Sequence, residues 1–242
     1  MVFGRFEVVV SENPVFGERR VCPVRNGIKY AVVDSESSSE DQGMRAGEVY
    51  SNPASGERGV VILGTHETGG KRIVIDLYLR PGGGMIERHY HPTIHERFKV
   101  IQGEVSYTLN GVEASAQPGQ TVDIPPGTLH SFWNSGSSEG LIRFDVQPAE
   151  RFAALIKNGF ALAQDGKTDA TGKPGILQIA LMAREFDDVV RYDMGPRLVQ
   201  RILFLILTPF ARLKGLKGSY PEYLIRPASE SVPLETLDRA GL

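Results

Sequence analysis

The sequence predicts a mainly β protein, an antiparallel barrel or sandwich, followed by an α-helical C-terminal extension. Between residues 60 and 147 short apolar stretches follow one another closely, with Gly and Pro between them, which is typical of antiparallel β folds. After Pro148 the apolar period changes from two residues to about 3.6, which indicates helices. Hydrophobic residues make up 41% of the 242 residues, enough for a real core.

Two of the expected strands carry clear local signals. In the segment 72–80, Ile73, Ile75, Leu77 and Leu79 share one face, as in a half-buried strand. The segment 105–112 contains Asn-Gly, the favoured turn of a β-hairpin. Further short β-stretches are at 60–63, 121–124, 129–133 and 141–146.

The chain is predicted to have three regions. Residues 1–43 form an N-terminal arm with short strands at 6–10 and 28–33 and an acidic linker at 34–41. Residues 44–147 form the β-barrel, and residues 148–242 form the helical extension. The pattern Asn-Pro-x-x-Gly-Glu-Arg occurs at 13–19 and again at 52–58, and both copies are predicted to be strand-connecting turns.

Three helices are expected in the extension: from Phe152 to near Gly166, over 176–192, and after Gly195-Pro196. The third contains six consecutive apolar residues, far short of the ~20 that a membrane span needs. We expect it to be buried against the barrel or a subunit partner. Because cationic residues flank it, contact of 197–217 with a membrane surface is the alternative.

Charge and cysteine content exclude several classes of function. The chain has 27 basic and 29 acidic residues, so no broad positive field indicates nucleic acid as a partner. The single cysteine, Cys22, excludes an internal disulfide and a Cys-based zinc motif. The first residues lack the pattern of a secretory signal, and the expected location is cytoplasmic.

Four of the five histidines lie between Gly83 and Asn134. His89 and His91 are two residues apart in an expected strand, so both point to the same face. In the next strand Arg97 and Lys99 mark the outward face, which turns Glu96 inward with the imidazoles. His130 follows the stiff Pro-Pro-Gly turn at 125–127. Three imidazoles and one carboxylate suit a divalent transition metal.

Both segments resemble the two motifs of the cupin superfamily. The segment 83–103 matches the first motif: Gly, five residues, His-x-His, four residues, Glu, six residues, Gly. The segment 119–134 matches the second: Gly, five residues, Pro-x-Gly, two residues, His, three residues, Asn. The resemblance covers about residues 60–147. It implies a cupin double-stranded β-helix, a jelly-roll barrel.

The resemblance also implies that His89, His91, Glu96 and His130 hold one divalent transition metal ion, with Fe or Mn favoured and Zn, Ni or Cu possible. His95 is excluded as a fifth ligand, because strand alternation points it away from Glu96.

Four further residues are candidates for the site. Glu87 shares a face with His89, so it could lie at the pocket mouth as an acid or base, or it could be an exposed carboxylate at a strand end. Phe98, Tyr107 and Phe132 could line the pocket, although aromatic residues on barrel strands usually pack in the core.

The predicted function is a metal-dependent, dioxygenase-like oxidoreductase acting on a small organic molecule, because many cupins with this ligand set are oxygenases. The alternatives are a non-redox isomerase, cyclase or decarboxylase, and a small-molecule-binding protein without turnover. Because cupin sheet edges often pair between subunits, a homodimer is expected.

Overall fold

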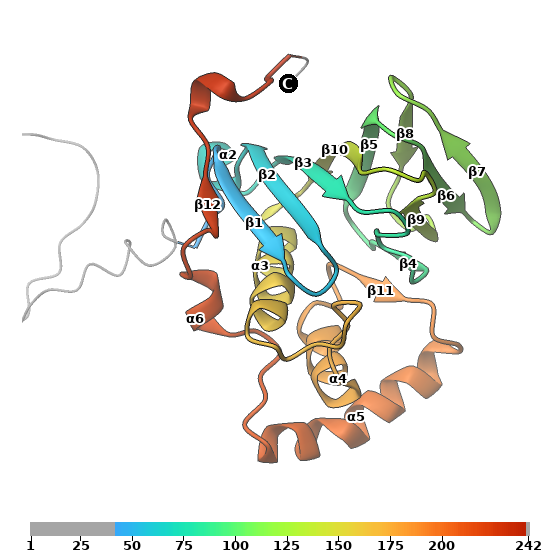
Figure 1. Ribbon diagram of the computed structural model, residues 1–242. Helices are drawn as coiled ribbons and strands as arrows, with labels where there is room; N and C mark the ends of the chain where they lie inside the picture. Colours follow the sequence, from blue (N-terminus) through green and yellow to red (C-terminus); the bar gives the residue numbers. More distant parts are fainter. Residues whose placement is uncertain (1–41, 241–242) are drawn as a thin grey trace, which may run out of the picture. The chain divides into compact units, whose positions relative to one another are not determined.

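The computed structural model describes residues 42–240. The expected strands at 6–10 and 28–33, the acidic linker and the first Asn-Pro turn lie outside the described residues. Within them the chain forms two antiparallel sheets followed by helices (Figure 1). The prediction of a mainly β fold with a helical C-terminal region is therefore confirmed.

Twelve strands make up the two sheets of the described residues. In chain order they are β1 Glu48–Asn52, β2 Glu57–Leu63, β3 Ile73–Leu79, β4 His89–Tyr90, β5 His95–Gln102, β6 Val105–Leu109, β7 Val112–Ala116, β8 Thr121–Ile124, β9 His130–Asn134, β10 Gly140–Gln147, β11 Arg191–Tyr192 and β12 Glu230–Ser231. One sheet has the order β12-β1-β2-β3-β10-β5-β8, and the other has the order β11-β4-β9-β6-β7. The short strands β11 and β12 follow the barrel in sequence. β12 is an edge strand of the first sheet, and β11 is an edge strand of the second.

The inward faces of both sheets form one apolar core. On β5, Phe98 and Val100 are buried while the residues between and beside them are exposed, as period-two alternation requires. Phe98 packs against Phe132 of β9 at 5.8 Å and Phe144 of β10 at 5.9 Å between ring centroids. The contact between Phe98 and Phe132 joins the two sheets across the barrel.

Local turn chemistry sets the register of two strand pairs. Asn110 and Gly111 adopt positive φ angles of 49° and 86°, as the favoured two-residue hairpin turn requires, and β6 pairs with β7 around them. Between β1 and β2, the Asn52 Oδ1 accepts hydrogen bonds from the backbone N–H of Ala54 and Ser55. The hairpin and the second Asn-Pro turn are confirmed.

All helices except α2 at Thr65–Thr68 follow the barrel in sequence. They are α3 Glu150–Gln164, α4 Ile176–Glu185, α5 Arg197–Leu213 and α6 Pro221–Leu224, with a 3-10 turn at Leu234–Thr236. No helix of the described residues is long and apolar enough to cross a membrane.

The expected helix over 176–192 is wrong in its second half. The helix ends at Glu185, and the chain then turns until Arg191 and Tyr192 pair with β4. The side chain of Asp187 accepts hydrogen bonds from Arg191 and Arg197, which holds the turn. The β-branched pair Val189-Val190 before Arg191 favours extended backbone over helix.

The third helix is expected to be buried against the barrel or a subunit partner; burial against the barrel is wrong, and a subunit partner stays a prediction. Helix α5 packs on α4 (Figure 1). Only Phe204, Thr208 and Ala211 of α5 are buried.

Candidate metal centre

Both sheets and the loop after β4 bring His89, His91, Glu96 and His130 together. His89 of β4 lies directly opposite His130 of β9, and Glu96 is on β5 of the other sheet. His91 directly follows β4, which ends at Tyr90. The next residue, Pro92, cannot donate to a sheet ladder. Local strand geometry and the pairing of β4 with β9 thus position the four side chains.

The four side chains each offer one ligand atom, and these atoms all lie within 4.8 Å of one another. The ring centroids of His89 and His130 are 4.1 Å apart. His91 Nε2 lies 3.0 Å from Glu96 Oε2, and His130 Nε2 lies 3.8 Å from Glu96 Oε1. One ion with bonds of about 2.1 Å spans about 4 Å between opposite ligands, so the cluster has the size of a single metal site.

Three backbone carbonyls fix the orientation of the imidazoles. The Nδ1–H of His89 donates to the Glu87 carbonyl at 2.9 Å, and that of His130 donates to the Thr128 carbonyl at 2.9 Å. The Nδ1–H of His91 donates to the Val189 carbonyl at 2.6 Å. With Nδ1 protonated in each ring, the neutral imidazole presents the lone pair of Nε2.

The cluster is buried and its inward atoms lack hydrogen-bond partners. The exposed fractions of the four residues are between 1% and 4%. His91 Nε2, Glu96 Oε1 and His130 Nε2 are buried without a hydrogen bond among the described residues. Since a buried polar atom without a partner costs about 1–3 kcal/mol, the cluster needs another partner, and a metal ion fits.

Burial and mutual charge shift the pKa values within the cluster. Burial, together with the charges of His130 and His91, lowers the pKa of His89 to about 3. Burial alone would raise the pKa of Glu96, but the neighbouring imidazoles of His130 and His91 outweigh burial and lower that pKa. Burial alone would lower the pKa of His130, but Glu96 outweighs burial and raises that pKa. At neutral pH the arrangement therefore favours an ionised Glu96 carboxylate and a neutral His89 imidazole, and metal ligation requires both.

The structure places His95 and Glu87 outside the cluster. His95 is exposed on the opposite face of β5, and its Nε2 lies 3.0 Å from Asp123 Oδ1. The exposed carboxylate of Glu87 pairs with Lys173 at 3.4 Å and lines a large cavity. An acid or base role for Glu87 stays a prediction.

The three aromatic candidates lie in the barrel core. Phe98 and Phe132 are buried, and Tyr107 is partly buried against Phe98 with 6.0 Å between ring centroids. None of these three side chains lines the cavity that Glu87 borders.

That cavity has a volume of about 830 Å³ and lies beside the cluster. Tyr192 lines it, and the Tyr192 ring is 6.2 Å from that of His89. Val190, next to the carbonyl that holds His91, lines it as well. The segment 189–192 therefore contacts both the cavity and the candidate metal centre.

The sequence prediction places this segment in a helix and therefore misses its contact with the candidate metal centre. The run Val189-Val190-Arg191-Tyr192, between an Asp-Asp pair and Gly195-Pro196, carried the signal of a short strand.

Comparison with known proteins identifies the barrel. Residues 76–145 match the family model described as a cupin domain. An oxidoreductase of Arthrobotrys oligospora is 26% identical over 112 residues, which are 43% of this chain and 44% of that protein. The match thus spans less than half of the relative.

Solved structures that are similar to part of this chain include a conserved protein with a double-stranded β-helix domain from Klebsiella pneumoniae. Its sequence identity is 27%, the match covers 41% of this chain and 84% of that chain, and the TM-score is 0.35. A sugar phosphate isomerase of the cupin superfamily from Silicibacter pomeroyi has 24% sequence identity. The match covers 43% of this chain and 69% of that chain, with a TM-score of 0.35. The family match and the two antiparallel sheets define a cupin double-stranded β-helix. The chain therefore contains a cupin domain, with a buried group of three histidines and one glutamate that could hold a metal ion.

Proposed function

We propose that this protein is a metal-dependent oxidoreductase of the dioxygenase type that acts on a small organic molecule. The ion, Fe or Mn, is held by His89, His91, Glu96 and His130. The observation that carries the proposal is the set of buried, unpartnered ligand atoms whose imidazoles are already oriented by backbone carbonyls. The distant relative named an oxidoreductase supports the redox class.

The four ligand residues bind the ion, fix its position and exclude water. Three neutral imidazoles and one carboxylate are a donor set that suits Fe, and a bound ion of this kind supplies Lewis acidity or a site for O₂ chemistry. Because the four side chains are at most 4% exposed, bulk water has little access to the centre.

The large cavity is the proposed substrate site. Its volume of about 830 Å³ lies within the range of small-molecule pockets, roughly 300–1,000 Å³. Its lining includes the apolar side chains of Met85, Ile86, Leu155, Ile179, Met182 and Met194. Such a lining suits a substrate with an apolar body.

Two polar groups of this cavity would orient the substrate. Burial raises the pKa of Glu57, against smaller lowering effects from Ser55 and Arg80, and its carboxyl oxygens can accept a hydrogen bond from a substrate hydroxyl. Burial and the charge of Glu87 raise the pKa of Tyr192 to about 12, so its phenol stays protonated at neutral pH. Tyr192 can thus donate to a substrate oxygen.

The test combines metal analysis with oxygen consumption. The protein is produced with Fe or Mn, its metal content is measured by mass spectrometry, and compounds that raise its melting temperature are tested in an oxygen electrode. We expect one compound to be consumed together with O₂, and His130→Ala to lose both metal and turnover. His95→Ala, with an exposed imidazole, is the matched control and should keep both.

Two outcomes would contradict the proposal. Turnover of a confirmed substrate without O₂ consumption would assign the site to non-redox chemistry, such as isomerisation or decarboxylation. Binding without turnover by the metal-replete protein, unchanged in His130→Ala, would assign it to a binding protein.

A further inference from the structure

Helix α5 turns its apolar side outward. Its buried residues are Phe204, Thr208 and Ala211, which face α4. Thr208 is a polar residue in this packed face: its hydroxyl donates to the Phe204 carbonyl at 2.6 Å, and it accepts from Arg184 of α4 at 3.4 Å. An ordinary surface helix does the reverse and buries its apolar stripe.

The exposed side of α5 carries eight large apolar residues with exposed fractions between 42% and 86%. On a helix of about 3.6 residues per turn they form one continuous arc of roughly 160° that also includes Pro209 and has no polar side chain. The eight residues are Leu198, Val199, Ile202, Leu203, Leu205, Ile206, Phe210 and Leu213. An exposed apolar surface of this kind marks an interaction site.

The charged residues of the segment that carries this arc have one sign. The segment 197–217 contains five cationic residues and no acidic residue: Arg197, Arg201, Arg212, Lys214 and Lys217. Arg197 and Lys217 form ion pairs with Asp187 and Glu222, and the other three have no carboxylate partner among the described residues. By the same helical period Arg201 and Arg212 fall at the edge of the arc, between the apolar side and the packed side. The partner of this surface is therefore apolar in its interior and anionic at its boundary.

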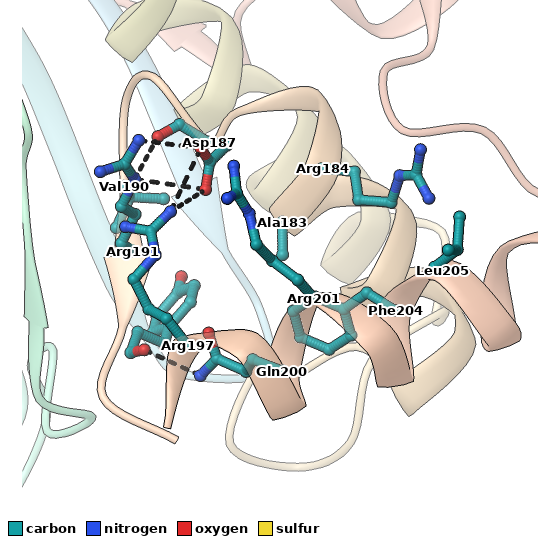
Figure 2. A pocket seen from close by; sticks show the side chains of 11 residues that line it. Ala183, Arg184, Asp187, Val190, Arg191, Arg197, Gln200, Arg201, Phe204 and Leu205 are labelled. Carbon is teal, nitrogen blue, oxygen red and sulfur yellow. Dashed lines mark hydrogen bonds and ion pairs between the residues drawn. The ribbon is translucent and has the colours of Figure 1, made fainter. Parts of the chain in front are cut away.

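A cavity beside α5 concentrates the positive charge. It has a volume of about 330 Å³ and is lined by Arg184, Arg191, Arg197 and Arg201, with Asp187 as its one carboxylate. Figure 2 shows Arg191 and Arg197 converging on Asp187. Among the described residues, Arg184 and Arg201 have no carboxylate partner. The cavity thus has uncompensated positive charge next to the apolar arc.

We propose that α5 docks this protein on the surface of an anionic lipid bilayer. The apolar arc lies among the acyl chains at the interface, and the arginines at its edge and in the neighbouring cavity contact lipid phosphates. A helix with one wide apolar face bordered by Lys and Arg is the pattern of an interfacial helix.

The charge also argues against a second copy of the chain as the occupant. A two-fold interface brings the same surface of both subunits together. Since 197–217 has five cations and no acid, pairing α5 with itself would place like charges against each other. An anionic membrane satisfies both the apolar arc and the cations.

The test is co-sedimentation of the full chain with vesicles. Vesicles of phosphatidylcholine and phosphatidylglycerol in equal parts should bind the protein at least about tenfold more tightly than phosphatidylcholine alone, and salt should weaken the binding. Ile206→Glu/Leu213→Glu changes two exposed residues of the arc and should reduce binding at least about a hundredfold. Arg201→Gln/Lys214→Gln should reduce it about tenfold.

A matched control separates the arc from general surface charge. Val112→Glu/Leu234→Glu adds two glutamates at exposed apolar residues outside α5 and should bind vesicles as the unchanged protein does. Circular dichroism and metal content check that all variants fold.

Three results would overturn the proposal. The first is no binding to the anionic vesicles, or equal binding to neutral ones. The second is equal loss in the α5 variant and its control. In the third, light scattering shows that the unchanged protein is a dimer and that the Ile206→Glu/Leu213→Glu variant is a monomer, and neither of the two binds vesicles. That result would assign the surface to a second copy.

Discussion

The Nδ1–H of His91 donates to the carbonyl oxygen of Val189 at 2.6 Å, across 98 residues of sequence. This hydrogen bond joins the candidate metal centre of the barrel to the segment after α4. The backbone N–H groups of Val189 and Val190 both donate to the Phe186 carbonyl at 2.9 Å, so the segment is a formed turn. The C-terminal region is therefore part of the centre.

Arg151→Gln tests this connection. The Arg151 guanidinium binds the Asp188 carboxylate and the Glu185 carbonyl, which hold the turn before Val189. We expect metal affinity, measured by competition with a chelating dye, to fall roughly tenfold, as for other groups that orient a ligand. Because the Arg151 side chain is 45% exposed, the free energy of unfolding should change by less than about 1 kcal/mol. Arg58→Gln, which removes an arginine that pairs with Glu230, should leave metal affinity unchanged.

Glu96→Gln tests the ligand assignment. The amide keeps the size of the side chain but removes the negative charge that a divalent ion needs, so metal affinity should fall at least about a hundredfold. Mass spectrometry of the purified protein measures the metal content. His95→Ala should retain the full metal content. Equal metal content in Glu96→Gln and the unchanged protein would mean that the ion binds elsewhere.

The inward direction of the candidate ligands could be predicted from sequence because it follows local rules, and the resemblance to the two cupin motifs implied that they form one set. Two-residue alternation separates Glu96 from His95 and Arg97, and the Pro-Pro-Gly turn precedes His130. The partner of His91 could not be predicted. It is a backbone carbonyl 98 residues away, and every residue has a carbonyl, so nothing in the identity of Val189 marks it.

Helix α5 shows a second limit of the sequence. The sequence predicts a helix after Gly195-Pro196 that contains six consecutive apolar residues, and the structure contains this helix. The apolar residues do not say which side of the helix faces the rest of the protein. Contacts of Phe204, Thr208 and Ala211 with α4 decide this, and they turn the larger apolar side outward.

The ion pair between Arg72 and Asp145 predicts a loss of stability in acid. Its two hydrogen bonds are both 2.9 Å. Burial alone would raise the pKa of Asp145, but Arg72 outweighs burial and lowers it. A lowered carboxyl pKa contributes stability above the unfolded-state value of about 3.9, and this stability is lost as the pH falls through the folded-state pKa.

Arg72→Gln should therefore destabilise the protein by about 1 kcal/mol at neutral pH. The difference from the unchanged protein should shrink below about pH 4. Urea unfolding at several pH values measures it. Lys217→Gln, which breaks an exposed pair with Glu222, should have little effect at any pH. A pH-independent loss in Arg72→Gln would mean that packing of the arginine stem, rather than charge, stabilises the site.

Asn134→Asp should destabilise the barrel. The Asn134 Nδ2 group donates to the carbonyls of Leu79 and Ser138 at 2.9 and 2.8 Å, and Oδ1 accepts from the Gly136 N–H at 2.9 Å. Aspartate has the same size but would direct a carboxylate oxygen at two carbonyls, which should cost about 3 kcal/mol. Thermal unfolding measures the change. Gln117→Glu introduces the same charge at an exposed residue and should change stability by less than about 0.5 kcal/mol.

Glu57→Gln should stabilise the protein at neutral pH and not in acid. Burial raises the pKa of the Glu57 carboxyl in the folded state, so the native state binds this proton more tightly than the unfolded state does. Ionisation therefore costs stability as the pH rises above the unfolded-state pKa of about 4.3, and the cost is complete above the folded-state pKa. Glutamine can still accept the hydrogen bond from the Ser55 hydroxyl, which is 2.9 Å long. We expect a gain of less than about 1 kcal/mol at neutral pH and none below about pH 4. Urea unfolding measures both, with the exposed Glu113→Gln as control. An unchanged stability at neutral pH would show that the Glu57 carboxyl is well solvated and that burial does not raise its pKa.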